Sequence, residues 1–149
     1  MDDDVIEDGA VNAALAKIVE GLTGAGLAAA LRAGALIVQN AWKGLAPYRT
    51  GTYRRSIHVE IETAGETEAT AIVGSGITAP PYPTYLEAGN YWVEARNARS
   101  LHFVARGGEQ VFVKRVFIPA HPSAGPAFDA SKDDAVREVE STMKALTGL

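Results

Sequence analysis

Apolar residues recur at every third or fourth position over two stretches near the start of the chain, a spacing typical of amphipathic helices. The first stretch runs from Val11 to Leu22, and glycines at positions 21, 24 and 26 interrupt it. The second stretch, residues 27–45, is more regular, and we expect it to be the main core helix. Its apolar stripe consists of Leu27, Leu31, Ala35, Val38, Trp42 and Leu45.

Apolar and polar residues then alternate at every second position, which is typical of half-buried strands. One such strand runs from Arg55 to Glu62, and residues 69–74 are expected to return antiparallel to it after a turn at residues 64–66. A second hairpin is predicted within residues 101–115, with Gly107-Gly108 as its turn.

Two further helical segments are predicted in the second half of the chain. Tyr85 to Ala88 should form a helical turn that Gly89-Asn90 ends. A C-terminal helix is expected to begin at Pro126, a favoured first position, and to run to Leu146. Its apolar stripe, which we expect to be buried, consists of Phe128, Ala135, Val139, Met143 and Leu146.

These elements predict an α+β fold. We expect an antiparallel sheet of about four strands, with the 27–45 helix and the C-terminal helix packed on one face. The 149 residues are enough for one domain with its own core. We expect residues 1–10 to be a polar arm and residues 91–116 to form a projecting hairpin.

The chain turns from helix to sheet between Ala46 and Ile57. Pro47 disfavours helical geometry at Ala46, so the long helix should end near residue 45. Thr50 can bond to the local backbone, and Gly51 adopts positive φ without steric penalty. The sequence therefore predicts a tight corner with a positive φ at Gly51.

Three sequence blocks resemble the tail-component (neck) family of long-tailed bacteriophages. The first is a long Ala-rich helix ending in Lys, followed by Ala-Pro and then x-Thr-Gly-x-x-x-x-Ser-Ile, here residues 43–57 at its end. The second is the Tyr-x-x-Tyr-hydrophobic-Glu-x-Gly segment of residues 82–89, and the third is the Pro/Phe helix entry of residues 125–130. The blocks occur in the family's order. The chain differs in having Asn90 where the family usually has Thr, and in a longer segment at 91–116.

The resemblance implies a structural protein rather than an enzyme. Similar proteins form a homo-oligomeric ring at the head–tail junction, between the head connector or stopper and the tail terminator or tail tube. A tail-terminator ring is the alternative within the class. The expected location is the neck of the virion, and the host cytoplasm during assembly. The resemblance also implies that Glu87 folds back toward the Thr50-Gly51 corner, where Arg49, Arg54 or Arg55 would pair with it.

Charge and composition limit the classes of partner that this chain is expected to bind. The net charge of −4, from 18 acidic and 14 basic residues, argues against tight nucleic-acid binding. DNA passing through a ring is therefore not expected to be gripped. No apolar run reaches the ~20 residues of a membrane span, and the acidic Met1–Asp4 start is unlike a signal peptide. The charge is uneven, because residues 1–8 hold five acids whereas residues 96–115 are basic.

Candidate chemistry is sparse. Residues 24–29 match the G-x-G-x-x-[GA] pattern of a dinucleotide site, so a small nucleotide-binding enzyme is the alternative of another class. That pattern needs a strand before the glycines and an acid after the next strand, and neither is predicted here. The chain has no Cys, and its three histidines fall in separate predicted elements. We expect no catalytic, cofactor or metal site.

Aromatic residues gather around predicted loops and corners, as at protein interfaces, although half of them could simply close the ends of the domain. The hairpin at 91–116 is expected to contact a neighbouring subunit. The residues predicted to form interfaces or to support them are Tyr48, Arg49, Thr50, Gly51, Arg54, Tyr85, Glu87, Gly89, Tyr91, Trp92 and Arg106.

Overall fold

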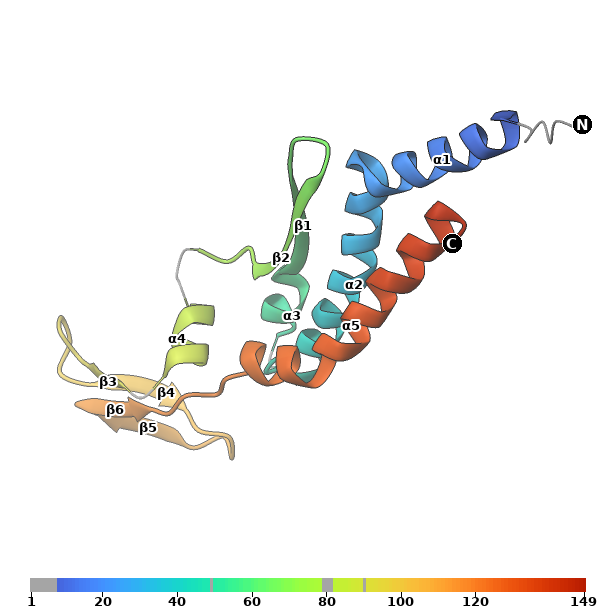
Figure 1. The fold of residues 1–149 in the computed structure, drawn as a ribbon. Helices are drawn as coiled ribbons and strands as arrows, with labels where there is room; N and C mark the ends of the chain where they lie inside the picture. The colour runs from blue at the N-terminus through green and yellow to red at the C-terminus, as the bar shows by residue number, and fades with distance from the viewer. Residues whose placement is uncertain (1–7, 49, 79–81, 90) are drawn as a thin grey trace, which may run out of the picture. The chain divides into compact units, whose positions relative to one another are not determined.

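The computed structural model describes residues 8–48, 50–78, 82–89 and 91–149 (Figure 1). They form two compact units. Unit 1 comprises residues up to Gly76 together with residues 124–149, and unit 2 comprises residues 77–123. Helices and antiparallel strand pairs are both present, so the predicted α+β class is confirmed. Whether the two units behave as one domain stays a prediction.

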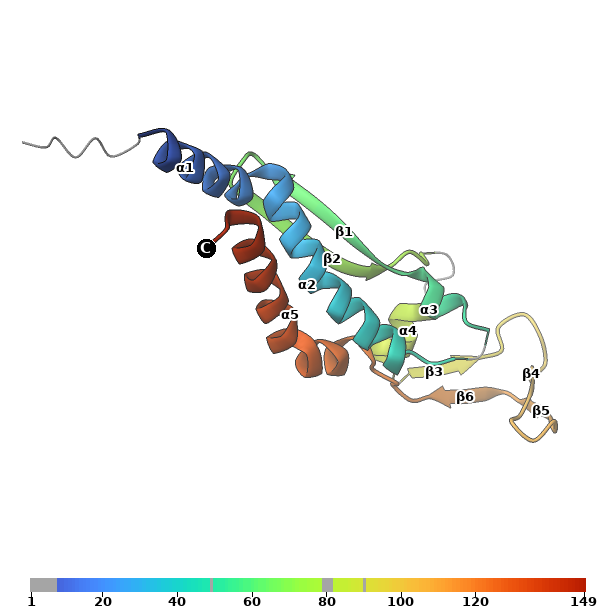
Figure 2. The ribbon, with the colours of Figure 1, turned by 90° about the vertical axis from the view of Figure 1, so that its right-hand side faces the viewer.

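Three helices and one hairpin make up most of unit 1: α1 (Asp8–Leu22), α2 (Gly24–Leu45), α5 (Ala124–Thr147) and the pair β1 (Ile57–Ala64) and β2 (Glu68–Ser75). Helix α2 lies between the hairpin and α5 (Figure 2). The predicted 27–45 helix is thus confirmed as the central element, although α2 begins three residues earlier.

Small residues let α2 and α5 approach closely. A Cβ added at Gly34 would lie 2.5 Å from Cγ2 of Val139 and 2.8 Å from the carbonyl oxygen of Ala135, so only glycine fits there. Ala30 and Ala127 are completely buried in the same unit. Because this close contact is made to α2, α5 packs chiefly on α2. The sequence had predicted instead that both helices pack side by side on one face of the sheet.

The β1–β2 hairpin runs in register from the pair Ile57–Ser75 to the pair Ala64–Glu68, as the alternation predicted. The strand begins two residues later than expected, because residues 52–56 form a short helix, α3 (Thr52–Ser56). Successive side chains of a strand point to opposite faces of the sheet. Ile57 lies on the inner face and is 1% exposed.

Unit 2 contains α4 (Tyr82–Ala88) and four short strands: β3 (Tyr91–Glu94), β4 (Leu101–Val104), β5 (Gln110–Val113) and β6 (Arg115–Ile118). Strands β4 and β5 form the predicted second hairpin. Strands β3 and β6 pair with each other and were not predicted. Each described strand pairs with one other strand only. The described strands therefore form three two-stranded sheets instead of the predicted single sheet of about four strands.

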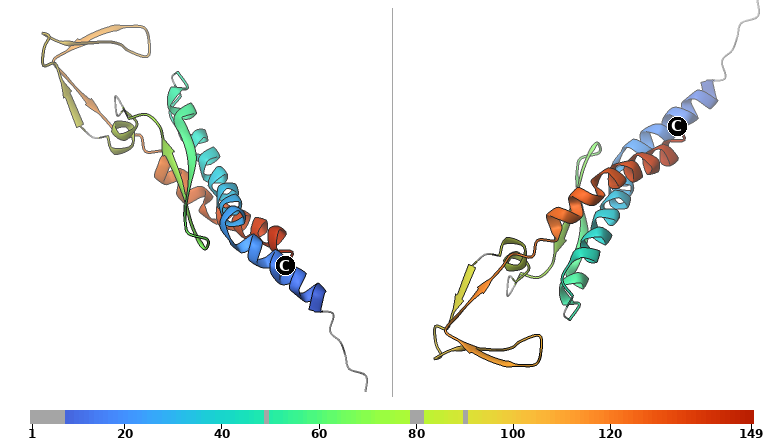
Figure 3. Two further views of the ribbon diagram at one scale, coloured as in Figure 1. Left: turned by 90° about the horizontal axis from the view of Figure 1, so that it is seen from above. Right: turned by 90° about the horizontal axis from the view of Figure 1, so that it is seen from below.

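The fully enclosed core of the described residues is small. Its buried apolar members are Ala30, Ala35, Ala46, Tyr53, Ile57 and Ala127. None of the described helices is by itself long and apolar enough to cross a membrane; α1 and α2 reach that length and composition only as a pair bent by 54°. Figure 3 shows this bend, beyond which the N-terminal turns of α1 extend past the end of α5.

Candidate functional site

The corner between α2 and β1 is built around Gly51. Its φ of 75° and ψ of −5° are left-handed, so the predicted positive φ is confirmed. A Cβ here would lie 2.8 Å from Nη1 of Arg55 and 3.0 Å from Cε2 of Tyr48. These are the ends of exposed side chains that can shift, so the left-handed backbone is the stronger reason for a glycine here. The Thr50 hydroxyl oxygen accepts the backbone N–H of Thr52 at 3.4 Å and supports the start of α3.

Arg54 ties this corner to the end of α2. Its Nε donates a 2.9 Å hydrogen bond to the carbonyl oxygen of Ala46, and its guanidinium carbon lies 4.9 Å from the centroid of the Tyr48 ring. Tyr48 is 69% exposed, so the stacked pair presents an aromatic ring and a positive charge at the surface. The corner brings together four of the predicted interface residues, whereas Arg49 lies outside the described residues.

The inner side of the corner is closely packed. Tyr53 is 4% exposed, and its ring meets that of Trp42 edge-on, with the centroids 6.3 Å apart. Ser56 donates a 2.7 Å hydrogen bond to the carbonyl oxygen of Tyr53 and lies 2.8 Å from the Ser75 hydroxyl. Gln39 on α2 donates to the carbonyl oxygen of Ile57 at 2.7 Å. The corner therefore locks α2, α3 and both strands together.

In unit 2, Glu87 and Gly89 fasten α4 to the segment that leaves β6. The Glu87 carboxylate accepts hydrogen bonds from the backbone N–H of Ser123, at 2.8 Å, and from its hydroxyl. Gly89 has a φ of 43°, and a Cβ there would lie 2.0 Å from Cα of Ala120. Both residues thus support the unit's own structure. The pairing of Glu87 with the corner arginines stays a prediction.

Strands β3 and β6 display aromatic rings at the surface. Trp92 lies opposite Phe117, with ring centroids 5.3 Å apart, and the guanidinium carbon of Arg115 lies 4.7 Å from the centroid of the Trp92 ring. Trp92 is 56% exposed and Phe117 is 44% exposed. Exposed aromatic and arginine side chains are typical of interface cores. The backbone of Tyr91 pairs with Ile118 in the same ladder.

The β4–β5 hairpin is exposed on both faces. Phe103 and Val104 point to opposite sides because they are neighbours in a strand, yet they are 39% and 54% exposed. Phe112 is 64% exposed and stacks on the His102 ring at 4.5 Å. Arg106 lies exposed in the turn, and Tyr85, on α4, is also exposed. That these residues contact a partner stays a prediction.

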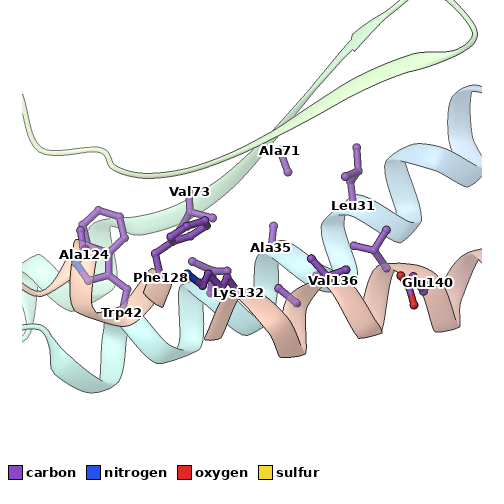
Figure 4. A pocket seen from close by; sticks show the side chains of 15 residues that line it. Leu31, Ala35, Trp42, Ala71, Val73, Ala124, Phe128, Lys132, Val136 and Glu140 are labelled. Atoms are coloured by element: carbon purple, nitrogen blue, oxygen red, sulfur yellow. The ribbon is translucent and has the colours of Figure 1, made fainter. Parts of the chain in front are cut away.

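An apolar groove of about 710 Å³ opens between α2, β2 and α5, all in unit 1 (Figure 4). Phe128 and Val136 of α5 line it and are 54% and 56% exposed. The expected burial of Phe128 is therefore wrong, and so is that of Leu146, which is 36% exposed. The helical periodicity placed Phe128 on the apolar stripe of α5. The helix contacts α2 through smaller residues, however, and the larger Phe128 faces the groove. The full lining is Leu31, Gly34, Ala35, Val38, Trp42, Ala71, Val73, Ala124, Gly125, Phe128, Lys132, Ala135, Val136, Val139 and Glu140.

The outward face of the β1–β2 hairpin is acidic. Glu60, Glu62, Glu66 and Glu68 are all exposed there or at its turn. His58 contacts the Ser56 carbonyl oxygen through Nδ1 at 2.9 Å and the Glu60 carboxylate through Nε2 at 2.8 Å. The carbonyl contact first, and then the Glu60 contact, raise the pKa of His58 above its usual 6.5, since both nitrogens donate when the ring is protonated.

A raised His58 pKa makes the hairpin's stability depend on pH. The contribution is fully present below the pKa of the unfolded chain and is lost as the pH rises through the higher pKa of the folded chain. We expect an NMR titration of His58 to give a midpoint above 6.5. Glu60→Gln should lower that midpoint. The unfolding free energy of this variant should also decrease less than that of the wild type as the pH rises above 6.5. Glu62→Gln is the control. An unmoved midpoint in Glu60→Gln would contradict this account.

Residues 24–29 do not have the structural context of a dinucleotide site. They open α2, and helix α1 precedes them where the fingerprint requires a strand. The glycines serve a close contact instead, because a Cβ at Gly26 would lie 2.4 Å from the carbonyl oxygen of Gly21. Among the described residues, no three His, Cys, Asp or Glu side chains are grouped so as to hold a metal ion.

A family model described as "Bacteriophage HK97-gp10, putative tail-component" matches residues 9–89, which is more than half of the chain. The matched range includes α1, α2, the Gly51 corner, the β1–β2 hairpin and α4. No curated protein and no solved structure matches the chain. The resemblance noted in the sequence is thereby confirmed, and two of its three blocks lie within the matched range.

Proposed function

The chain belongs to the HK97-gp10-like family of bacteriophage tail components, and from this premise we propose that it forms a ring at the junction of head and tail. In this ring, identical subunits join the head connector on one side to the tail tube on the other. Each subunit uses two different surfaces, and the head-to-tail contacts close by rotation. The ring assembles in the host cytoplasm and stays in the neck of the virion.

The observation that carries this proposal is the mismatch between the exposed and the buried apolar residues. The buried set consists mostly of alanines, whereas larger side chains on both units are about half exposed, among them Leu15, Trp92, Phe112, Phe128 and Val136. Phe128 and Val136 line one apolar groove of unit 1, and a groove of this kind marks an association site because monomeric proteins rarely expose large apolar patches. A ring of copies supplies the missing burial.

The acidic β1–β2 face suits a lumen through which DNA passes. A duplex carries dense negative charge, so a wall bearing Glu60, Glu62 and Glu68 repels it and does not retain it. The purified protein should accordingly show no salt-sensitive binding to duplex DNA.

The test is a phage in which the gene for this chain is silenced. We expect lysates to contain DNA-filled heads and separate tails of normal length, seen by electron microscopy. Purified wild-type protein added to the lysate should restore joined, infectious particles, and a labelled C-terminus should mark the junction. Heat-unfolded protein serves as the control.

Two outcomes would contradict the neck position. Tails of abnormal length would indicate a ring that stops tail polymerisation. Joined particles of normal infectivity in the silenced phage would show that this chain does not connect head and tail.

A further inference from the structure

Helix α1 carries an apolar stripe that is not covered within the part of the chain that the structure describes. Val11, Leu15, Val19 and Leu22 lie on one helical face and are 47%, 54%, 59% and 48% exposed. The exposed charged residues Lys17 and Glu20 lie on the opposite face by helical geometry. An amphipathic helix with this pattern is the shape that a hydrophobic groove recognises.

The apolar groove between α2, β2 and α5 matches this stripe in chemistry and length. Of the described residues that line it, only Lys132 and Glu140 are charged. Along α5 the lining extends from Ala124 to Glu140, which at 1.5 Å per residue is about 24 Å. The stripe of α1, residues 11–22, spans about 17 Å by the same measure. The stripe therefore fits within the groove.

The α1 helix of the same chain cannot reach this groove. Only Thr23 joins α1 to α2, and the two helices are bent by 54°, far from the reversal that folding back would need. The bend is fixed by close packing, since Gly26 abuts the carbonyl oxygen of Gly21. The backbone N–H of Gly24 also donates to the carbonyl oxygen of Glu66 at 2.9 Å.

We propose that α1 of one copy lies, with its apolar stripe inward, in the apolar groove of the next copy. Both halves of the contact belong to unit 1 of every chain, so each copy gives one helix and receives one. This is the head-to-tail arrangement that generates rings. The inference deepens the proposed ring and rests on it.

Charge sets the direction of the helix in the groove. Five acidic residues fall within residues 1–8, before the stripe. Lys132 already lies 3.7 Å from the Asp129 carboxylate of its own helix, so Glu140 decides the direction. With the start of α1 toward Glu140 like charges come together, and the opposite direction, with the start toward Lys132, avoids this. Such complementarity fixes register more than it adds affinity.

The first experiment introduces one charge on each half of the contact. Leu15→Glu breaks the helix stripe and Val136→Glu breaks the groove, and both positions are more than half exposed, so the fold should persist by circular dichroism. We expect each variant to need about tenfold or more protein for half-maximal association in sedimentation velocity. Ala13→Glu, on the other face of α1, is the matched control and should associate like the wild type.

Mixing the two variants tests the head-to-tail geometry. Leu15→Glu keeps an intact groove and Val136→Glu keeps an intact helix, so the mixture should form pairs that do not grow further. Pairs would support the contact. Normal association of either charged variant, or a mixture without pairs, would overturn it.

The chain has no cysteine, so introduced cysteine pairs report the contact specifically, and the positions used are about half exposed. Val11→Cys with Phe128→Cys should cross-link between copies on mild oxidation, and Leu22→Cys with Phe128→Cys should not. Cross-linking of the Leu22–Phe128 pair in place of the Val11–Phe128 pair would contradict the proposed direction of the helix. Cross-links from the groove to another phage protein would contradict the proposal that a second copy occupies the groove. If rings persist in Leu15→Glu, this contact fails while the proposed function stands; if the wild-type protein is absent from the junction, the proposed function fails.

Discussion

Tyr53→Ala is expected to lower the free energy of unfolding by about 3–5 kcal/mol, the range measured for removing a buried aromatic ring. Tyr53 is 4% exposed and packs edge-on against Trp42. Its loss leaves a cavity where α2, α3 and β1 meet, and these elements are locked by hydrogen bonds that restrict collapse around it. Urea unfolding, followed by circular dichroism, measures the change.

Two matched variants show whether the ring itself carries this effect. Tyr53→Phe keeps the aromatic ring and should cost much less than Tyr53→Ala. Tyr48→Ala removes a tyrosine that is 69% exposed at the same corner, so its unfolding free energy should stay within about 0.5 kcal/mol of the wild type. Equal losses in Tyr53→Ala and Tyr48→Ala would show that the corner is not a packed part of unit 1.

Periodicity predicted the long elements of the fold well. The apolar spacing of residues 27–45 and the alternation from residue 57 onward each report one buried face, and α2 and β1 follow them. The elements that it missed are short. Helix α3 has five residues and strands β3 and β6 have four each, too few for either period to show.

A stripe shows which face avoids water but does not show what covers that face. The stripe of the C-terminal helix predicted burial for Phe128 and Val139 alike, yet Val139 meets Gly34 while Phe128 faces the open groove. The same limit applies to α1. Its apolar face is evident in the sequence, but only the structure shows that Leu15 and Val19 stay exposed.

The candidate site was predictable where a single residue type is physically required. Gly51 needed a left-handed backbone because the chain reverses within a few residues of Pro47, and it has one. The role of Glu87 could not be read in this way. Its hydrogen bonds reach Ser123, 36 positions away, and no local pattern encodes such a distant partner.

Removing the β4–β5 hairpin is expected to abolish assembly and to leave the rest of the chain folded. Among the described strands, β4 and β5 pair only with each other, and a two-stranded hairpin is marginal in water. Its Phe103, Val104 and Phe112 are exposed. It lies in the most basic segment of an acidic chain. We infer that an acidic surface on a neighbouring subunit or ring covers it and supplies the missing burial.

The end of the β3–β6 ladder offers two neighbouring positions, Ala95 and Lys114, at which the hairpin can be removed and the chain rejoined. Strands β3 and β6 pair on their own, and their ladder continues to a 3.0 Å hydrogen bond from the backbone N–H of Ala95 to the carbonyl oxygen of Lys114. Deleting residues 96–113 and joining Ala95 to Lys114 through Asn-Gly makes a two-residue hairpin turn that favours this pairing. The deleted protein should keep the melting temperature of the wild type yet fail to restore joined particles in the silenced phage. A variant that shortens only the turn, by deleting Gly107, controls for changed length and should restore them. If the deletion variant joins heads to tails with normal yield, the hairpin is not the assembly element, because the surface removed would then have no partner in the particle.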